Sequence, residues 1–298
     1  MTDTLIKDVS DTAFMIAIYR AIESERADAL FRDPLARKLA GEHGQRIVAG
    51  MSRRGPFAMR SRIMVWMMAI RTRIIDDFVL SAVAKGADAI LNLGAGLDTR
   101  PYRMQLPQSL VWIEVDYPRV IDLKDARLAG EQPHCRLERV KLDLANLPAR
   151  ARLFAELGSR FNNVLVLTEG VIPYLGNEDV GRLAEDIKSQ RSFRHWIVDY
   201  FSAEAVRMRK RTAIQRYMQN APFLFEPKDY FGFFAGHGWR TAEIRYISEE
   251  GKRLNRPIPI PFLGMAWFAL LSVFMSKRQR EGRRKFAAYV LLEPMQEK

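Results

Sequence analysis

The stretch ADAILNLGAGLDTR, residues 87–100, combines a short apolar run with a turn that contains two glycines. Such a run followed by a glycine turn is typical of a buried strand that leads into a ligand-binding loop. A second apolar run, VWIEVD, ends at Asp116, twenty residues after Gly96. If the two runs form neighbouring parallel strands, the turn and the carboxylate lie together at one edge of a sheet. This pairing predicts a nucleoside-binding site.

On both sides of this stretch, apolar runs of strand length alternate with segments of helical period. This alternation is typical of an α/β fold in which a mostly parallel sheet carries helices on both faces. We expect seven strands, near residues 89–92, 111–116, 136–143, 163–168, 193–200, 241–248 and 286–292. We expect helices over residues 12–25, 57–85 and 177–190, the last with Asn177 as its N-cap.

The composition fits one large domain over residues 1–298, because a chain of this length with 48% hydrophobic residues can bury a sizeable core. We expect a helical cap and lead-in helix over 1–86, the sheet core over 87–248 and 286–298, and an insertion over 249–285. The first residues lack the pattern of a secretory signal, so the mature protein is expected to begin near Met1. One cysteine and four histidines predict neither a disulfide framework nor a metal site, which fits a cytoplasmic protein.

The glycine turn differs from the one that binds dinucleotides. A dinucleotide fingerprint has a third glycine three residues after the second, where this chain has Thr99. Pro101 and Pro107 also leave little room for a helix whose N-terminus would hold a pyrophosphate. S-Adenosylmethionine carries no phosphate and requires only that the backbone comes close. The turn therefore favours this cofactor, although a glycine turn alone is common in α/β proteins.

Carboxylates near other strand ends strengthen the prediction. Asp116 can accept hydrogen bonds from both ribose hydroxyls, and Asp143 with Leu144 offers an acceptor and an apolar face for adenine. Glu169 follows the fourth expected strand, again at the edge where ligands bind in open α/β sheets. The structural alternative for each carboxylate is a helix N-cap or an ordinary loop position.

The combined motifs resemble the S-adenosylmethionine-dependent leucine carboxyl methyltransferase family, in particular its bacterial branch of small-molecule O-methyltransferases. The segments that carry the resemblance are LNLGAGLDTRPYR, EVDYPRVIDLK, LDL and LTEGVIPYL. Further likeness lies in DTAFMIAIYRAIESERADALFRDPLARKLAG, IRTRIIDDFV and YVLLEP, so that only residues 245–285 fall outside it. The resemblance implies the class I methyltransferase fold, with S-adenosylmethionine as the cofactor.

The resemblance also implies roles for individual residues. Either Arg71 or Arg73 would bind the methionine carboxylate, and Glu169 would lie near the methionine amino group. The residues implied for the rest of the cofactor are Gly94, Ala95 and Gly96 beneath it, Asp116 at the ribose, and Asp143 with Leu144 at adenine. Arg71 and Arg73 are two residues apart in one expected helix and point to different sides, so only one can enter the site.

Methyl transfer from a sulfonium is an in-line displacement that requires alignment and exclusion of water, and no metal. A carboxylate acceptor is already ionised at neutral pH, whereas a hydroxyl acceptor requires a base within hydrogen-bond reach. Candidates for the acceptor side are Tyr174, Asp199 and Tyr200. His237 is a weaker candidate, because a histidine beside glycines is usually an ordinary turn residue. The sequence identifies no catalytic residue.

An apolar stretch, residues 262–275, precedes the basic segment KRQREGRRK. Its fourteen residues are fewer than the roughly 20 needed to cross a bilayer, and the strands before and after it belong to one sheet. We therefore expect no transmembrane span. Two interpretations remain open: a buried lid helix over the acceptor site, or peripheral contact of residues 262–285 with an anionic membrane.

The expected function is O-methyl transfer to a small, apolar carboxylic acid or hydroxyl compound, such as a polyketide-like natural product. A nucleic-acid methyltransferase is the competing enzyme, motivated by the net charge of +12 and by Arg207, Arg209, Lys210 and Arg211. The loop VIPY lacks the polar residue and the paired prolines typical of base amino-methylation, so no nucleic-acid partner is expected. A third alternative is a non-catalytic module that binds S-adenosylmethionine.

Overall fold

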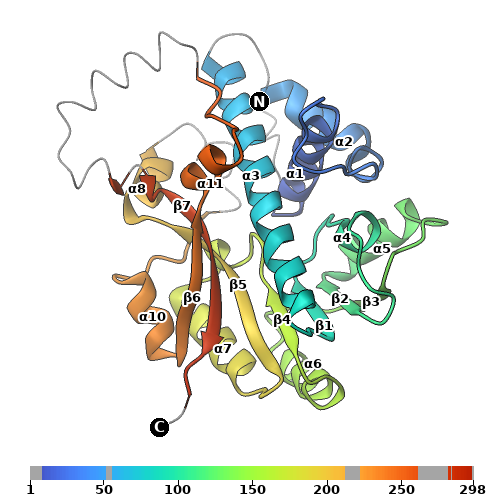
Figure 1. Ribbon diagram of the computed structural model, residues 1–298, viewed down its shortest axis with the longest axis vertical. Helices are drawn as coiled ribbons and strands as arrows, with labels where there is room; N and C mark the ends of the chain where they lie inside the picture. Colours follow the sequence, from blue (N-terminus) through green and yellow to red (C-terminus); the bar gives the residue numbers. More distant parts are fainter. Residues whose placement is uncertain (1–8, 52–55, 212–221, 261–280, 283, 297–298) are drawn as a thin grey trace.

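The computed structural model describes residues 9–51, 56–211, 222–260, 281–282 and 284–296 (Figure 1). One sheet of seven strands occupies its centre, in the order β3-β2-β1-β4-β5-β7-β6. The strands are β1 (Ala89–Leu93), β2 (Val111–Asp116), β3 (Arg136–Lys141), β4 (Val164–Leu167), β5 (Phe193–Phe201), β6 (Trp239–Tyr246) and β7 (Ala287–Pro294). All seven predicted strands are present, with ends that differ by a few residues.

Strands β1 to β5 are parallel, and β7 runs antiparallel between β5 and β6. This strand order, with its single reversed strand, is that of a class I methyltransferase, so the predicted fold class is confirmed. Asn92 of β1 lies opposite Glu114 of β2 and Leu167 of β4. Because these strands end level with one another, the loops that follow them meet at one edge of the sheet.

The helices that the structure describes cover both faces of the sheet (Figure 1). They are α1 (Val9–Ser24), α2 (Ala36–Met51), α3 (Pro56–Ala84), α4 (Arg100–Arg103), α5 (Pro118–Arg127), α6 (Leu147–Arg160), α7 (Asn177–Lys188), α8 (Ala203–Arg211), α10 (Tyr230–Gly236) and α11 (Ile247–Arg253). A short 3-10 helix, η1 (Ile172–Tyr174), follows β4.

Two apolar layers hold these elements together. On one face, side chains of α6, α7 and α10 pack against β1, β2, β4 and β5 around Trp196 and Phe234. On the other face, the 29-residue helix α3 buries Ile74 and Phe78 against the sheet. Burying one such side chain contributes about 1.5–3 kcal/mol, so α3 is firmly anchored along the sheet.

The helical cap is built from α1 and α2, which pack against the N-terminal half of α3. Helix α1 and the long helix α3 lie where the sequence predicts them. Helix α2 was not predicted. Its segment is interrupted by Gly41, whose φ of 57° lies in the left-handed region and kinks the helix.

Two details of the sequence prediction are wrong. The N-cap of α7 is Gly176, while the Asn177 side chain accepts a hydrogen bond from the Glu226 amide at 2.9 Å. The sixth strand begins at Trp239 and ends at Tyr246, because the chain turns into α11 at Ile247.

The predicted insertion is described only in part. Helix α11 packs against α3, and Trp66 of α3 donates a hydrogen bond to the Arg256 carbonyl at 2.8 Å. The apolar residues 262–275 and most of the basic segment lie outside the described residues. Within the described part of the chain, no helix combines the length and the apolarity needed to cross a membrane.

Candidate cofactor site

The glycine turn after β1 depends on left-handed backbone at two positions. Gly94 has a φ of 67° and Gly96 a φ of 49°. A Cβ atom on Gly94 would lie 2.5 Å from Cγ2 of Val171, so the loop after β4 closely approaches the turn. The amides of Gly94 and Ala95 both donate to the Val115 carbonyl, at 2.8 and 3.1 Å, which fixes the turn over the end of β2.

Asp116 is joined directly to this turn. Its Oδ2 accepts a hydrogen bond from the Gly96 amide at 2.6 Å, and its Oδ1 accepts one from the Tyr117 amide at 2.7 Å. Burial raises the pKa of Asp116, while the two backbone donors act in the opposite direction. A carboxylate has about four acceptor positions, so both oxygens can still accept from a ribose hydroxyl.

Asp143 and Leu144 lie in the loop after β3, beside the same edge. Asp143 is exposed; it accepts a hydrogen bond from the Ala145 amide at 2.9 Å and another from the Tyr117 side chain. Leu144 packs against the core as a half-buried side chain. Tyr117 thus links Asp143 to Asp116, so the residues expected at adenine and ribose are near neighbours.

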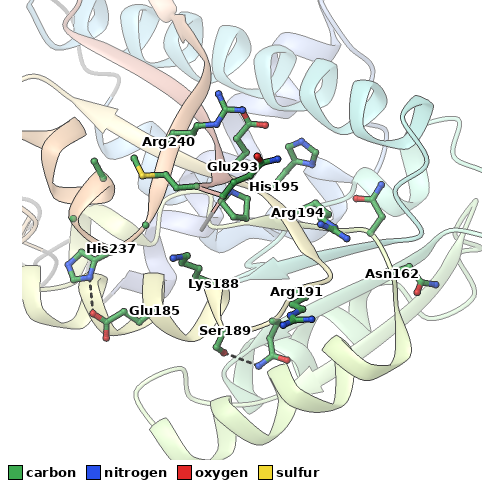
Figure 2. Close-up of a pocket in the computed structure, with 18 residues that line it drawn as sticks. Asn162, Glu185, Lys188, Ser189, Arg191, Arg194, His195, His237, Arg240 and Glu293 are labelled. Atoms are coloured by element: carbon green, nitrogen blue, oxygen red, sulfur yellow. Dashed lines mark hydrogen bonds and ion pairs between the residues drawn. The ribbon is translucent and has the colours of Figure 1, made fainter. Parts of the chain in front are cut away.

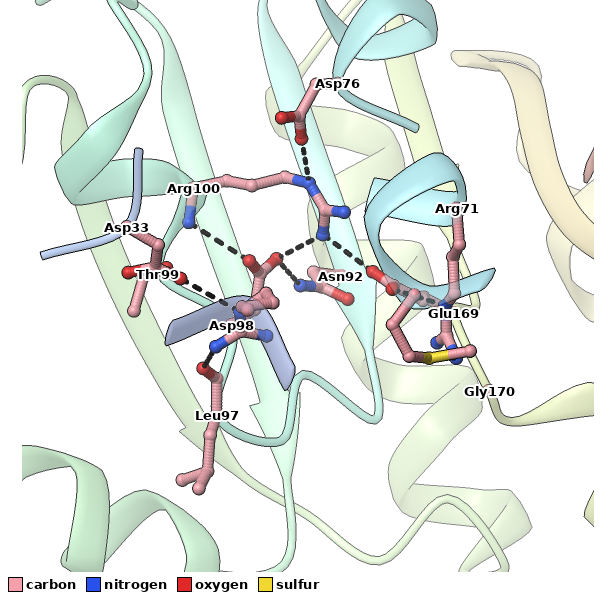
Figure 3. A network of polar contacts seen from close by, with 12 residues as sticks. Asp33, Arg71, Asp76, Asn92, Leu97, Asp98, Thr99, Arg100, Glu169 and Gly170 are labelled. Atoms are coloured by element: carbon pink, nitrogen blue, oxygen red, sulfur yellow. Dashed lines mark hydrogen bonds and ion pairs between the residues drawn. The ribbon is translucent and has the colours of Figure 1, made fainter. Parts of the chain in front are cut away.

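A buried network of charges fills the space between α3, α4 and β4 (Figure 3). Glu169 pairs with Arg71 at 2.6 Å through one oxygen and with Arg100 at 2.7 Å through the other. Burial raises the pKa of Glu169, but Arg100 and Arg71 outweigh this effect and hold the pKa below its usual value. Glu169 is therefore an anion between two cations.

The structure places the two arginines of α3 in different surroundings. Arg71 is buried beside Glu169, whereas Arg73 is directed toward Asp77 at 2.8 Å with 41% of its side chain exposed. The helical geometry explains the difference, because residues two apart point about 160° from one another, given 3.6 residues per turn. Arg71 therefore belongs to the candidate site, and Arg73 forms an ordinary ion pair outside it.

The site fits the amino-acid part of S-adenosylmethionine. That part carries one carboxylate and one ammonium group, and Arg71 and Glu169 offer a guanidinium and a carboxylate side by side. Gly170 keeps the approach open, since a Cβ atom there would lie 3.0 Å from Nη2 of Arg71. Helix α4 is only four residues long, so the turn leads into no extended helix that could bind a pyrophosphate.

The three acceptor-side candidates do not share one cluster. Asp199 accepts a hydrogen bond from the Gly170 amide at 2.8 Å and also bonds the Tyr289 side chain, so it lies beside Arg71. Its pKa is raised by burial. Tyr200 points to the opposite face of β5, as adjacent strand residues must, and stacks on Phe231 with 5.6 Å between ring centroids.

Tyr174 ends η1, directly after the loop that carries Glu169 and Gly170. Its ring meets Phe223 edge to face at 5.3 Å, and Phe223 in turn contacts Phe201 at 5.2 Å. Phe201 and Asp199 lie on the same face of β5. The structure therefore groups Tyr174 with Asp199 and separates Tyr200 from both.

His237 lies at the opposite edge of the sheet. It follows α10 and pairs with Glu185 of α7 at 2.9 Å. His237 is therefore far from the edge of the sheet that carries the cofactor motifs. It is an ordinary turn histidine, which was the alternative interpretation of this weaker candidate.

Sequence reasoning missed the residues that support Glu169 and Arg71. Asp98 and Asp76 both bind Arg100, at 2.9 and 2.7 Å, and Asn92 donates to Asp98 at 2.9 Å. Asp98 and Arg100 belong to the motif LGAGLDTR. Their position directly after the glycine turn could have indicated that they lie at the candidate site. Nothing in the local sequence indicated that Asp76 of α3 would meet them.

Comparison with known proteins identifies the family. The family model for leucine carboxyl methyltransferase matches residues 13–188, and the chain belongs to this family. A protein of Mycobacteroides abscessus, assigned as an S-adenosyl-L-methionine-dependent methyltransferase, is 31% identical over 85% of this chain and 91% of its own length. A Mycolicibacterium smegmatis protein with the same assignment is 33% identical over 81% and 86%.

A solved structure supports the fold. A DUF574 family protein from Streptomyces avermitilis superimposes with a TM-score of 0.51 at 15% identity, over 94% of this chain and 96% of that one. Together, the family membership and the strand order establish an S-adenosylmethionine-dependent methyltransferase, with S-adenosylmethionine as its cofactor.

Proposed function

We propose that the protein transfers a methyl group to an oxygen atom of a small, apolar carboxylic acid or hydroxyl compound. S-Adenosylmethionine, when bound, supplies an activated methyl group. In this proposal Arg71 and Glu169 hold the amino-acid end of the cofactor, while Asp116 holds the ribose. Asp143 and Leu144 lie at adenine.

The observation that carries the proposal is an aromatic wall on the face of β5 that carries Asp199. Phe223 contacts both Tyr174 and Phe201, and Phe201 lies on the same face of β5 as Asp199. Aromatic side chains of this kind favour an apolar acceptor, because they present large apolar surface to it. This wall supports a small organic molecule rather than a charged nucleic-acid backbone.

The polar groups near the wall fit oxygen chemistry. A carboxylic acid requires no base, because it is ionised at neutral pH. Asp199 is buried and already accepts from Gly170 and Tyr289, so its first task is to hold the loop beside Arg71. A hydroxyl acceptor would find in Asp199 a carboxylate whose pKa is raised toward neutrality.

The test is a methyl-transfer screen with radiolabelled S-adenosylmethionine over matched series of carboxylic acids, phenols, amines and thiols. We expect transfer to acids or phenols, with rates that rise with the apolar size of the acceptor. Transfer confined to amines or thiols, or to RNA, would contradict the proposal.

Matched arginine variants test the cofactor assignment. Arg71→Lys loses the planar guanidinium beside Glu169, so we expect roughly a tenfold or larger increase in the cofactor Kd. Arg73→Lys changes an outward ion pair, and we expect a Kd within about twofold of the wild type. Isothermal titration with S-adenosylhomocysteine measures both. Equal losses in the two variants would contradict the assignment of Arg71.

A further inference from the structure

A cavity of about 1300 Å³ lies at the edge of the sheet opposite to the cofactor motifs (Figure 2). Its walls come from the end of α7, the starts of β5 and β6 and the end of β7. The cofactor loops follow the far ends of β1, β2 and β4. The cavity is therefore separate from the cofactor site.

The cavity carries an excess of positive charge. Its walls hold four cationic side chains and two carboxylates, namely Lys188, Arg191, Arg194, Arg240, Glu185 and Glu293. Arg240 pairs with Glu293 at 2.7 Å, and Glu185 pairs with His237 at 2.9 Å. Among the residues that the structure describes, no carboxylate pairs with Lys188, Arg191 or Arg194.

Arg194 reaches the cavity from a β-bulge. In the pairing of β5 with β4, Phe193 lies opposite Val164 and His195 lies opposite Leu165, which leaves Arg194 as the extra residue. Bulges redirect the side chain of the extra residue away from the regular alternation. Arg194 is exposed, although its neighbours Phe193 and Trp196 are fully buried.

Lys188 is placed by a glycine. Gly238 has a φ of 78°, and a Cβ atom there would lie 2.3 Å from the Lys188 ammonium. The ammonium therefore lies directly over the backbone of Gly238. Figure 2 shows Lys188, Arg191 and Arg194 among the residues that line the cavity. Like charges gathered in this way repel one another unless an anion lies between them.

The electrostatics around His195 agree with this picture. His195 lines the same cavity, and its pKa is lowered, chiefly by burial. Glu293 acts in the opposite direction, while Lys85 and Arg194 lower the pKa further. His195 is therefore neutral at pH 7 and adds no charge of its own.

We propose that this cavity binds a ligand with two or more adjacent phosphate groups. The phosphates would lie between Lys188, Arg191 and Arg194, which can form charge-assisted hydrogen bonds with them. A nucleoside polyphosphate and an inorganic polyphosphate share this phosphate chemistry and differ in the nucleoside.

The experiment compares two triple variants of the full chain by isothermal titration with inorganic tripolyphosphate and with ATP. The first is Lys188→Gln/Arg191→Gln/Arg194→Gln. The second is a control of equal charge change at exposed cations away from the cavity, Arg136→Gln/Arg152→Gln/Lys252→Gln. Binding of S-adenosylhomocysteine, which should be equal in all proteins, verifies that each variant is folded.

We expect both probes to bind the wild type, and the first variant to bind roughly tenfold or more weakly, because three charge-assisted contacts are lost. The control variant should stay within about twofold. Tighter binding of ATP than of tripolyphosphate would identify a nucleotide as the ligand, and equal binding would identify the phosphate chain alone. Absence of binding, or equal losses in the two variants, would overturn the proposal. So would binding of heparin without binding of tripolyphosphate.

Discussion

Gly94 shows at the scale of one residue how the cofactor turn is built. Its backbone is left-handed, and its missing side chain leaves room for Val171. Gly86 has a similar left-handed φ of 85°, but no atom lies within 4 Å of the Cβ that it lacks. Substitutions at these two glycines therefore distinguish the effect of backbone strain from the effect of steric crowding.

We expect Gly86→Ala to lower the free energy of unfolding by about 1–2 kcal/mol through backbone strain alone, without changing the cofactor Kd. Gly94→Ala should lower it further and weaken cofactor binding, because the new methyl group meets Val171. Chemical denaturation and isothermal titration measure the two effects. The double variant Gly94→Ala/Val171→Ala should recover part of the affinity, and a failure to recover any would contradict the crowding argument.

We expect Asp116 to make cofactor affinity depend on pH. In the proposed cofactor site the ribose hydroxyls would donate to its ionised carboxylate, and burial raises its pKa above the ordinary value of 3.8. Protonation therefore begins at a higher pH than for an exposed aspartate, and affinity should fall by at most about tenfold per unit below that pKa. Titrations with S-adenosylhomocysteine between neutral and mildly acidic pH measure the slope.

Asp116→Asn is the control for this pH dependence, because an amide does not titrate. We expect the variant to bind more weakly at neutral pH and with a flatter profile. Any slope that remains belongs to Asp199, whose pKa is also raised by burial. An unchanged slope in Asp116→Asn would show that Asp116 is not the titrating group.

At the scale of elements, α1 is tied to the cofactor turn through Arg20. This buried arginine pairs with Asp33 at 2.9 Å and donates to the Leu97 carbonyl at 2.5 Å. Thr99 donates to the same Asp33 oxygen at 2.6 Å. The helical cap thus holds the turn on the side away from the sheet.

We expect Arg20→Gln to lower the free energy of unfolding by about 3–5 kcal/mol, because it leaves Asp33 buried without its cation. It should also weaken cofactor binding, since Leu97 loses its donor. Arg37→Gln breaks an exposed pair with Glu25 in the same cap and should cost about 0.5 kcal/mol or less. Thermal unfolding and isothermal titration of the two variants measure these effects. An unchanged cofactor Kd in Arg20→Gln would show that the glycine turn keeps its shape without its contact to α1.

The sequence predicted the elements whose signals are local. The strands, α1 and α3 follow from apolar period, and the candidate cofactor residues Gly94, Asp116 and Glu169 follow from their place after strands. The prediction missed α2, because its glycines weaken the helical pattern. It also missed the bond of Arg20 with Leu97, which joins residues 77 positions apart and leaves no trace in either local sequence.

At the scale of the whole molecule, the proposed cofactor site joins residues from three separate elements. Arg71 comes from α3, Glu169 from the loop after β4, and Asp116 from β2. A ligand that binds all three stabilises the folded state by mass action, by about 2.7 kcal/mol at one hundred times its Kd. Binding should therefore raise the temperature of unfolding.

We expect S-adenosylhomocysteine to raise this temperature, and adenosine, which lacks the amino-acid part, to raise it less. NAD is the matched negative control, because its pyrophosphate finds no extended helix after the glycine turn. Differential scanning calorimetry makes the comparison. An equal shift with NAD would mean that the turn does accept a pyrophosphate.

The position of β7 has a consequence for synthesis and truncation. Among the described strands, β6 pairs only with β7, and β7 is the last of them in sequence order. During translation β6 leaves the ribosome before β7, the described strand with which it pairs. The pair formed by β6 and β7 can therefore join the sheet only late in translation. A stop codon just before Ala287 would delete the eight residues of β7. Strand β6 would then lack the strand that connects it to the sheet, so the sheet would lose two strands.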